Sequence, residues 1–282
     1  MPDLIAADAV ASDALHAAFT AAFADYVAGP FRLDPTQWPG FIARQCVNLA
    51  LSRVALDDQG APAAFAFVAE RPAQQRWRLA TMGAVPAARG RGDAAALLQD
   101  LIARATEAQQ HGLELEVFAQ NPRAVKLYER HGFVAVAALQ GHEAAALGGA
   151  ATAPPADVLS AVSRAEALAW LERAEAAQPE LPLQLAAPVV ARADGWTAWQ
   201  RGSAQLIFGD AADGGLVIRS LVDLDATQRD AQVLAAALRQ AHPERRVTLP
   251  PLLPDRLGGE ALQRAGFTRQ PLHQWWMHRA LP

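Results

Sequence analysis

The sequence predicts a mixed α/β (α+β) fold in two tandem domains, each a twisted, mostly antiparallel sheet flanked by helices. The first observation is that apolar periodicity up to residue 145 gives the order β-α-α-β-β-β-α-β-α-β. The second is that residues 146–157 are rich in small residues and proline, which is typical of a linker. The third is that much of the same order of elements returns in residues 158–282.

Composition supports two ordinary cores and excludes several classes of partner. The chain has 282 residues, of which 52% are hydrophobic. A net charge of −4 gives no basic footprint, so no nucleic-acid partner is expected. Because the sequence lacks a signal-peptide pattern and an apolar run near the roughly 20 residues of a membrane span, we expect a cytoplasmic protein with no membrane partner. The single cysteine, Cys46, excludes an internal disulfide and is expected as a buried thiol inside a helix.

The elements before residue 85 are predicted to be a strand, two helices and a meander. Residues 4–27 give a short strand and then a helix, and Asp34-Pro35 starts a second helix that runs to about Val47. The apolar runs 51–56 and 63–70 flank an aspartate-rich turn and therefore predict a hairpin. Residues 77–85 add the third strand of the meander.

The elements after residue 94 begin with a long helix, for which Gly112 is expected as the terminating glycine. Residues 113–118 then alternate as a strand between two faces. Asn121 and Pro122 suit the N-cap and first position of the next helix, which Gly132 ends.

Residues 84–94, AVPAARGRGDA, predict an anion-binding turn between a strand and a helix. Gly90 and Gly92 allow positive φ and close backbone approach, and the first N–H groups of a helix have no partner inside it. The helix dipole adds about half a positive charge at the same end. The stretch is therefore expected to hold a pyrophosphate compound.

A sequence repeat supports the two-domain interpretation. Gly132-Phe133 and Gly266-Phe267 each follow the last helix of a half, which sets an offset of 266 − 132 = 134. The residues at this offset from Arg89, Gly92, Ala94, Asn121 and Tyr128 are Asp223, Ala226, Gln228, Asp255 and Leu262. The second half therefore keeps the order of elements and lacks both the glycine turn and the tyrosine.

Two motifs of the first half together resemble those of the GNAT superfamily of acyl-CoA-dependent N-acetyltransferases. Arg89-x-x-Gly92-x-Ala94 after a strand is similar to the family pattern R/Q-x-x-G-x-G/A. A second pattern, V-x-x-x-N-x-x-A-x-x-L-Y-x-x-x-G-F, is matched by Val117, Asn121, Ala124, Leu127, Tyr128, Gly132 and Phe133. The resemblance covers residues 1–145, and the rest of the chain resembles a degenerate second copy.

The resemblance implies acetyl-CoA as acyl donor and no metal. Pantetheine would insert where strand 77–85 splays from the next parallel strand and would pair with backbone groups of Met82 and Ala84. Asn121 would bond the pantetheine or a water near the thioester. The pyrophosphate would bind the backbone N–H groups of Arg89, Gly90, Arg91, Gly92, Asp93 and Ala94.

The resemblance also implies two catalytic residues. Tyr128 would protonate the departing thiolate, for which a phenol of pKa ~10 is a suitable acid. Glu116, five residues before Asn121, would accept the proton of the amine directly or through water. Alternation puts Glu116 on one face with Glu114 and Phe118, which does not establish that it faces the cleft. Water alone as the base remains open.

We therefore expect an N-acetyltransferase whose first domain, residues 1–145, moves an acetyl group to a primary amine by direct attack in a ternary complex. The alternatives are a non-catalytic acyl-CoA-binding sensor or interaction module, and a purely structural tandem domain. The second domain could cap the acceptor site or mediate a homodimer.

The acceptor, a small molecule or a peptide, stays open. Arg32 would fit an acidic acceptor, whereas Glu70, Glu114 and Glu116 would fit a cationic one. Phe31, Arg32 and Trp38 lie where this fold shapes its acceptor pocket, although helix packing is the favoured interpretation for them.

Overall fold

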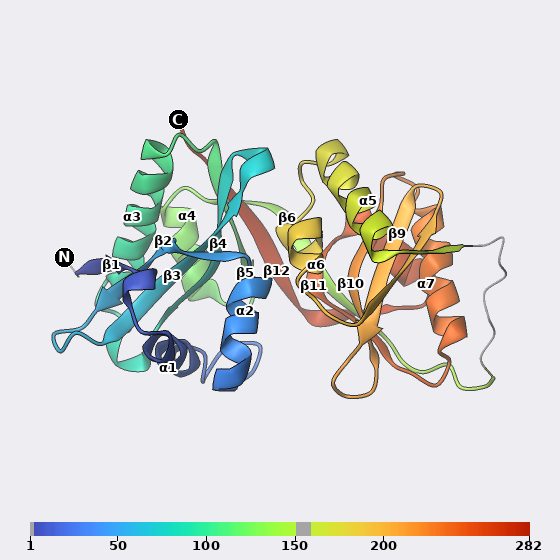
Figure 1. The fold of residues 1–282 in the computed structure, drawn as a ribbon, viewed down its shortest axis with the longest axis horizontal. Helices are drawn as coiled ribbons and strands as arrows, with labels where there is room; N and C mark the ends of the chain where they lie inside the picture. Colours follow the sequence, from blue (N-terminus) through green and yellow to red (C-terminus); the bar gives the residue numbers. More distant parts are fainter. Residues whose placement is uncertain (1–2, 151–158) are drawn as a thin grey trace. The chain divides into compact units, whose positions relative to one another are not determined.

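The computed structural model describes residues 3–150 and 159–282, which divide into two compact units (Figure 1). Unit 1 consists of residues 1–136 and 275–282, and unit 2 consists of residues 137–274. The units differ from the predicted domains at two places, because residues 137–145 belong to unit 2 and residues 275–282 belong to unit 1. Of the predicted linker, 146–157, the part from residue 151 lies outside the described residues.

The elements of unit 1 follow the predicted order, which is thereby confirmed. The strand β6 (Val134–Ala144) begins in unit 1, and β12 (Thr268–Ala280) ends in it. The others are β1 (Leu4–Ala6), α1 (Ser12–Ala22), α2 (Trp38–Arg44), β2 (Val47–Leu56), β3 (Pro62–Arg71), β4 (Arg76–Ala84), α3 (Asp93–Glu107), β5 (Gly112–Phe118) and α4 (Pro122–Arg130).

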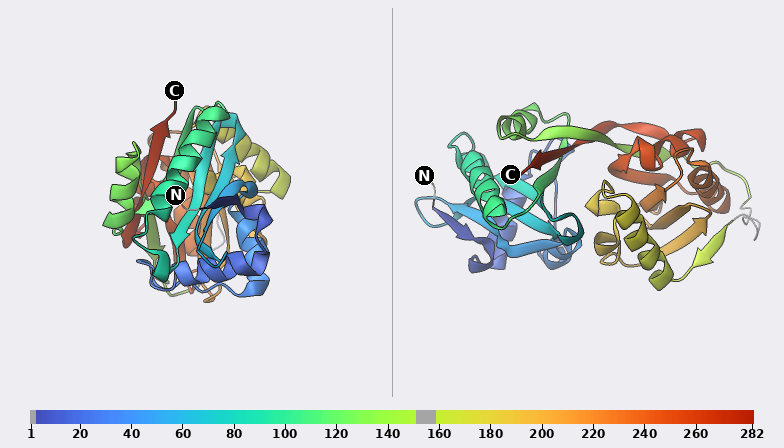
Figure 2. Two further views of the ribbon diagram at one scale, coloured as in Figure 1. Left: turned by 90° about the vertical axis from the view of Figure 1, so that its left-hand side faces the viewer. Right: turned by 90° about the horizontal axis from the view of Figure 1, so that it is seen from above.

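The sheet of unit 1 has the strand order β1-β2-β3-β4-β5-β12. Its strands β1 to β4 pair antiparallel, and β4 pairs parallel with β5. Alternation along β3 divides the core: Ala64, Ala66 and Val68 pack under α3 and α4, whereas Phe65 and Phe67 pack under α1 and α2. The two pairs of helices thus cover opposite faces of this sheet (Figures 1 and 2).

The prediction for the second helix was wrong at its C-terminal end. The helix α2 ends at Arg44, and β2 already begins at Val47. Cys46 adopts a left-handed backbone conformation with φ 56°, which ends the helix. The cysteine therefore lies half-buried in a turn, not inside a helix.

Gly112 has a different role from the predicted helix cap. Gln109, with φ 54°, takes the left-handed position after α3, while Gly112 is the first residue of β5. A Cβ at Gly112 would lie 2.7 Å from the carbonyl oxygen of Arg279. The glycine thus permits the close approach of β12 to β5, which a hydrogen bond from Leu281 N to His111 O also holds at 3.1 Å.

Unit 2 has the same plan. Ser163 and Glu166 form a capping box at the start of its first helix, and α8 begins at Gly259 because residues 255–257 form a separate 3-10 turn. Its strands have the order β6-β11-β10-β9-β8-β7, with β10 and β11 parallel. Its elements are β7 (Ser160–Val162), α5 (Arg164–Ala177), α6 (Ala187–Val190), β8 (Trp196–Arg201), β9 (Ala204–Asp210), β10 (Leu216–Asp223), α7 (Arg229–Ala241), β11 (Val247–Pro254) and α8 (Gly259–Arg264).

Each unit is completed by a strand that the sequence repeat assigns to the other half. The final strand beside β5 in unit 1 is β12, and the final strand beside β11 in unit 2 is β6. Both units otherwise share an antiparallel meander and a helical crossover, α3 or α7, to a parallel strand. The repeat of element order is therefore confirmed, and the closing strands are exchanged between the halves.

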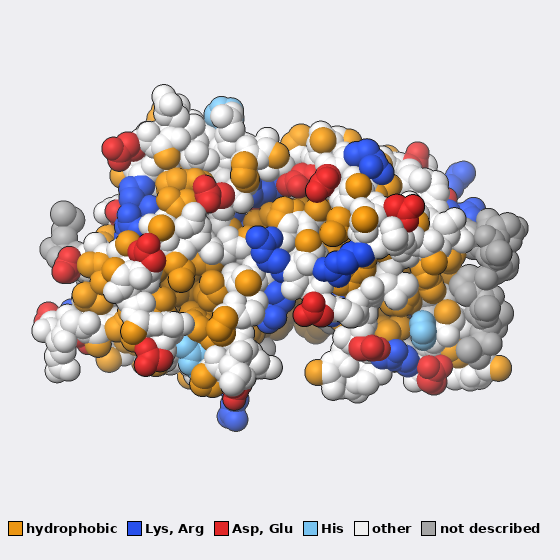
Figure 3. Space-filling view, in the orientation of Figure 1, with side chains coloured by type: hydrophobic (Ala, Val, Ile, Leu, Met, Phe, Trp, Pro, Cys, Tyr) orange, Lys and Arg blue, Asp and Glu red, His pale blue; other side chains and the backbone are white. Residues whose placement is uncertain are grey.

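The surface of both units mixes charges of both signs. Acidic and basic side chains are interspersed on the face seen in Figure 3. Local geometry, not a broad field of one sign, would therefore decide where an anionic ligand binds on this face. Among the described residues, the helices fall short of the length and apolar character that a membrane span needs.

Candidate active site

The two parallel strands of unit 1 part at the centre of the sheet. The register pairs of β4 with β5 run from Arg76↔Gly112 to Leu79↔Leu115. Directly after Leu79, Ala80 is an extra residue against β3, because the pairs there are Leu79↔Val68 and Thr81↔Phe67. Such a bulge bends and twists a strand. The predicted splay is therefore found, as a wedge between the C-terminal halves of β4 and β5.

The backbone of β4 directs hydrogen-bonding groups into this wedge. Val85 N donates to Ala63 O of the β3 side at 2.9 Å. Backbone groups of successive strand residues point to opposite edges, so Gly83 also faces β3, while Met82 and Ala84 face the β5 side. This is the edge for which pairing with pantetheine is predicted.

The turn after β4 leaves open space at its glycines. Gly90 and Gly92 have φ of 88° and 95°, and a Cβ at either would meet nothing within 4 Å. Gly92 is the N-cap of α3 and provides no side-chain cap. The first N–H groups of α3 therefore adjoin an unfilled glycine turn, which is the arrangement that binds phosphate at a helix N-terminus.

The two arginines of the turn differ in their partners. Both terminal nitrogens of Arg89 lie 2.6 Å from the carboxylate of Asp25, so this guanidinium is already neutralised. The Arg91 side chain is 46% exposed, and its Nε lies 3.9 Å from Oδ2 of the buried Asp93. Arg91 is thus the more accessible cation at the turn.

The helix α4 begins as predicted. Asn121 Oδ1 accepts a hydrogen bond from Ala124 N at 3.2 Å, and Pro122 is the first residue of the helix. This cap uses the oxygen of the amide, so the Nδ2 group is the part of Asn121 that could donate to a ligand or a water.

Tyr128 of α4 is buried under the α3–α4 face of the sheet. Its side chain belongs to the core that contains Leu113 and Leu115, and its ring packs edge-on against Phe133 at 5.9 Å. Burial raises the pKa of the Tyr128 hydroxyl, and the nearby Tyr26 raises this pKa further. The phenol therefore stays protonated at neutral pH and has a proton that it can donate.

Tyr26, in the segment after α1, also lies at this site. Its ring lies 5.8 Å from that of Phe118, the last residue of β5, at the mouth of the wedge. Burial raises the pKa of Tyr26 to about 12. The chain has 2 tyrosines, and both lie at this site. The scarcity of tyrosine is the one feature of the sequence that indicates a role for Tyr26 beyond packing.

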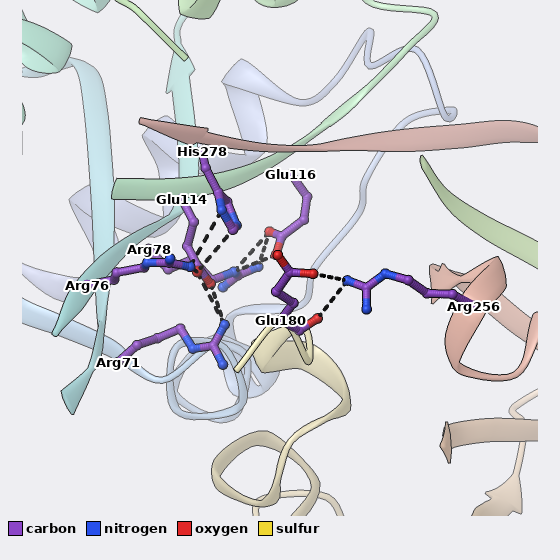
Figure 4. A network of polar contacts seen from close by, with 8 residues as sticks. All are labelled: Arg71, Arg76, Arg78, Glu114, Glu116, Glu180, Arg256 and His278. Carbon is purple, nitrogen blue, oxygen red and sulfur yellow. Dashed lines mark hydrogen bonds and ion pairs between the residues drawn. The ribbon is translucent and has the colours of Figure 1, made fainter. Parts of the chain in front are cut away.

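Glu116 points to the face opposite Tyr128 and is held by Arg78 (Figure 4). Arg78 Nε lies 3.0 and 2.9 Å from the two carboxylate oxygens, and Nη2 lies 2.7 Å from one of them. Both side chains are buried. Arg78 therefore engages both oxygens of the Glu116 carboxylate inside the protein.

Glu114 forms a second buried pair in the same network (Figure 4). Its carboxylate accepts from Arg71 at 2.9 Å, with Arg76 and His278 each at 3.8 Å. Burial raises the pKa of Glu114, and Arg71 opposes that rise. The carboxylate is thus engaged inside the protein, which weakens the argument that it selects a cationic acceptor.

The residues proposed for an acceptor pocket divide into buried and exposed ones. Trp38 is buried in the core between α1, α2 and the sheet, so the packing interpretation holds for it. Phe31 and Arg32 are exposed in the segment between the two helices. Glu70 is exposed on β3 and accepts from Asn48 Nδ2 at 2.9 Å.

Unit 2 has filled the place that the anion turn takes in unit 1. Asp223, which stands at the repeat position of Arg89, accepts from Ala231 N in the first turn of α7 at 3.0 Å. The same carboxylate accepts from Ser203 Oγ at 2.6 Å and from Asp225 N at 3.0 Å. A carboxylate of the chain itself therefore occupies this helix N-terminus.

Two histidines, the buried His142 and the half-buried His278, predict acid sensitivity of the fold. Burial lowers the pKa of His278 and of His142 from 6.5 to about 4, so both are neutral at pH 7. Between these values the unfolded chain binds more protons, so stability is complete above pH 6.5 and is lost as the pH falls toward 4. Each histidine should contribute up to about 1.4 kcal/mol per pH unit to this loss.

Urea unfolding at several pH values between 7 and 4.5 tests this prediction. His278→Gln and His142→Gln should each make the fall in the free energy of unfolding shallower than in the wild type. The same change at the exposed His111 is the control. Equal slopes in all variants would contradict the assignment.

Comparisons with known proteins bear on the family of residues 14–133 and on the fold of the chain. A model of the acetyltransferase (GNAT) family matches residues 14–133. A GCN5-related N-acetyltransferase from Sphaerobacter thermophilus is similar to the chain with a TM-score of 0.63 and 17% identity, over 98% of this chain and 93% of that one. A putative acetyltransferase from Pyrococcus horikoshii is similar with a TM-score of 0.65 and 11% identity, over 100% and 89%. A search of curated protein sequences returns no match.

The wedge, the glycine turn and these likenesses define a tandem protein of the acetyltransferase fold. Residues 14–133 match the model of the acetyltransferase (GNAT) family and form a domain of that family within the chain. The structural likenesses extend the fold over both units. Acyl transfer is accordingly the general class of activity, with acetyl-CoA as the donor that the family uses.

Proposed function

We propose that unit 1 transfers an acetyl group from acetyl-CoA to a primary amine by direct attack in a ternary complex. The observation that carries this proposal is the wedge between β4 and β5, which begins after Leu79↔Leu115 and leads to the open turn at Gly90 and Gly92. The acceptor would be a small molecule or a peptide. The proposal adds the chemistry of particular residues to the general class that the family gives.

The donor would bind along the edge of β4. Its pyrophosphate would accept from N–H groups of residues 89–94, where the dipole of α3 favours negative charge and Arg91 adds a cation. Its pantetheine would pair with the backbone of Met82 and Ala84. The amide of Asn121, at the start of α4, would bond the pantetheine or a water.

The two candidate catalytic residues would act from opposite faces of the sheet. The amine nitrogen attacks the thioester carbon, so that the C–N bond forms and the C–S bond breaks. The sulfur leaves as a thiolate and takes the proton of Tyr128, whose burial keeps it protonated until then. The nitrogen loses its proton on the α1–α2 face, where Glu116 lies.

Because Glu116 is paired with Arg78, a proton relay through a water between the amine and Glu116 is more plausible than direct transfer to the carboxylate. Arg78 occupies both carboxylate oxygens at 2.7 to 3.0 Å, which hinders a direct contact of the amine with them. A relay through water would pass the proton toward the carboxylate or on to solvent. The base is then a water that Glu116 orients, and Arg78 fixes the carboxylate that does so.

Tyr128→Phe should lower kcat by about 100-fold while the KM for acetyl-CoA stays within about twofold, because the ring packing on Phe133 survives and only the acid is lost. Release of CoA thiol, measured with a panel of primary amines, checks this. Unchanged turnover would make Tyr128 a packing residue. If the wild type binds acetyl-CoA and no amine of the panel releases thiol, the non-catalytic alternative is favoured.

A further inference from the structure

A salt bridge joins two segments of unit 1. The first is the glycine turn of residues 89–94, here called the donor turn, and the second is the segment of residues 23–34 between α1 and α2. Arg89 Nη1 lies 2.6 Å from Asp25 Oδ2, and Nη2 lies 2.6 Å from Oδ1. Arg89 Nη2 also donates to Ala22 O, the last residue of α1, at 3.1 Å. Two parallel bonds of this kind fix the orientation as well as the distance of the partners.

The pair is too exposed to matter much for folding. The Arg89 side chain is 30% exposed and that of Asp25 is 63% exposed. Surface ion pairs contribute little to the free energy of unfolding because water screens them. Its effect should therefore be on the position of the 23–34 segment and not on the stability of unit 1.

The 23–34 segment carries side chains to the mouth of the wedge. Tyr26 follows Asp25 directly, and its ring lies 4.8 Å from Phe23 and 5.8 Å from Phe118 of β5. At the far end of the segment, His16 Nε2 lies 2.7 Å from Leu33 O. Polar contacts thus hold the segment at both ends. The contact near its start is the ion pair between Asp25 and Arg89 of the donor turn.

We propose that Asp25 is a positioning residue for the acceptor: through Arg89, it couples the donor turn to Tyr26 and the 23–34 segment. Binding of the donor orders the turn and, through this pair, the segment against which the amine then binds. This inference rests on the proposed acetyl transfer and assigns the Arg89 guanidinium to Asp25 instead of to the phosphates.

The competing assignment, Arg89 as a phosphate ligand, makes opposite predictions for two variants. If Arg89 bound phosphate, Asp25→Asn would free the guanidinium and tighten CoA binding, whereas Arg89→Gln would weaken it. If Arg89 instead positions the 23–34 segment through Asp25, the affinity for CoA changes by less than about threefold in both variants. Both variants then raise hydrogen exchange of the segment equally, and the double variant raises it no further. Calorimetry with CoA separates the two.

Hydrogen exchange of residues 23–34 tests the coupling without an acceptor. Asp25→Asn, Arg89→Gln and the double variant should raise exchange there by about tenfold in the ligand-free protein, to the same level. CoA should protect the segment in the wild type only. Asp100→Asn, which removes the 2.8 Å pair with Arg104 elsewhere in unit 1, is the matched control and should leave the segment unchanged.

With an amine that the wild type acetylates, Asp25→Asn should raise the KM for the amine about tenfold and leave the KM for acetyl-CoA unchanged, and Asp25→Glu should restore part of the loss. Unchanged exchange in the ligand-free variants, or tighter CoA binding by Asp25→Asn, overturns the proposal. If the wild type binds no CoA, the proposed function fails, whereas the ligand-free exchange still decides whether the pair holds the segment.

Discussion

A chain that ends at Gln274 should fail to fold unit 1 stably, although it keeps every predicted site residue. The missing residues 275–282 belong to unit 1 and include the part of β12 beside β5. Met277 is 1% exposed in the same core as Tyr128, and Trp275 and Leu281 pack against that core. The truncation therefore removes core side chains and leaves β5 as an open edge.

The expected loss is comparable to the whole stability of a domain. Truncating a buried methionine to alanine alone costs about 2 to 5 kcal/mol, and the open strand edge favours aggregation. Since domains are stable by roughly 5 to 15 kcal/mol, removal of the strand should abolish cooperative unfolding of unit 1. A fragment of residues 1–145, the domain predicted from sequence, lacks the same strand and should behave in the same way.

Urea unfolding followed by circular dichroism measures this effect. Met277→Ala in the full chain should lower the free energy of unfolding by about 2 to 5 kcal/mol. A chain without Pro282, which is exposed after β12, is the control and should unfold as the wild type does. A truncated chain with the wild-type midpoint would show that β12 is dispensable for unit 1.

The order of elements could be predicted because its signals are local. Asn121 with Pro122, and Ser163 with Glu166, are helix starts that neighbouring residues decide, and the structure has both. The choice of partner for β6 and β12 is not local. The side-chain pattern of each strand is the same whichever strand it pairs with. The pattern therefore identifies β6 and β12 as strands and does not identify the sheet to which each belongs.

The glycine turn was predictable for the same reason, whereas the side-chain partners at the site were not. A positive φ at Gly90 and Gly92 follows from residue type and spacing. Arg89 pairs with Asp25, which is 64 positions away, and Arg78 with Glu116, which is 38 positions away. Alternation gave the face on which Glu116 lies but not the arginine that meets it there, because that depends on strand pairing.

Gly92→Glu should lower the affinity for acetyl-CoA at least 100-fold, or about 2.7 kcal/mol, while unit 1 stays folded. A side chain at φ 95° costs about 1 to 2 kcal/mol of backbone strain, and its Cβ meets nothing within 4 Å, so the fold should tolerate it. The new carboxylate would fill the open side of the turn and repel the pyrophosphate at the N-terminus of α3. Calorimetry with acetyl-CoA measures the loss.

Gly60→Glu is the matched control, because it adds the same charge and a similar strain outside the turn. Gly60 lies in the hairpin between β2 and β3 with φ 79°, and a Cβ there also meets nothing within 4 Å. It should leave the affinity for acetyl-CoA unchanged. Equal losses in the two variants would point to general destabilisation, and wild-type affinity in Gly92→Glu would mean that the donor binds elsewhere. The open side of this turn is supported as the donor site only if the affinity for acetyl-CoA falls in Gly92→Glu and not in Gly60→Glu.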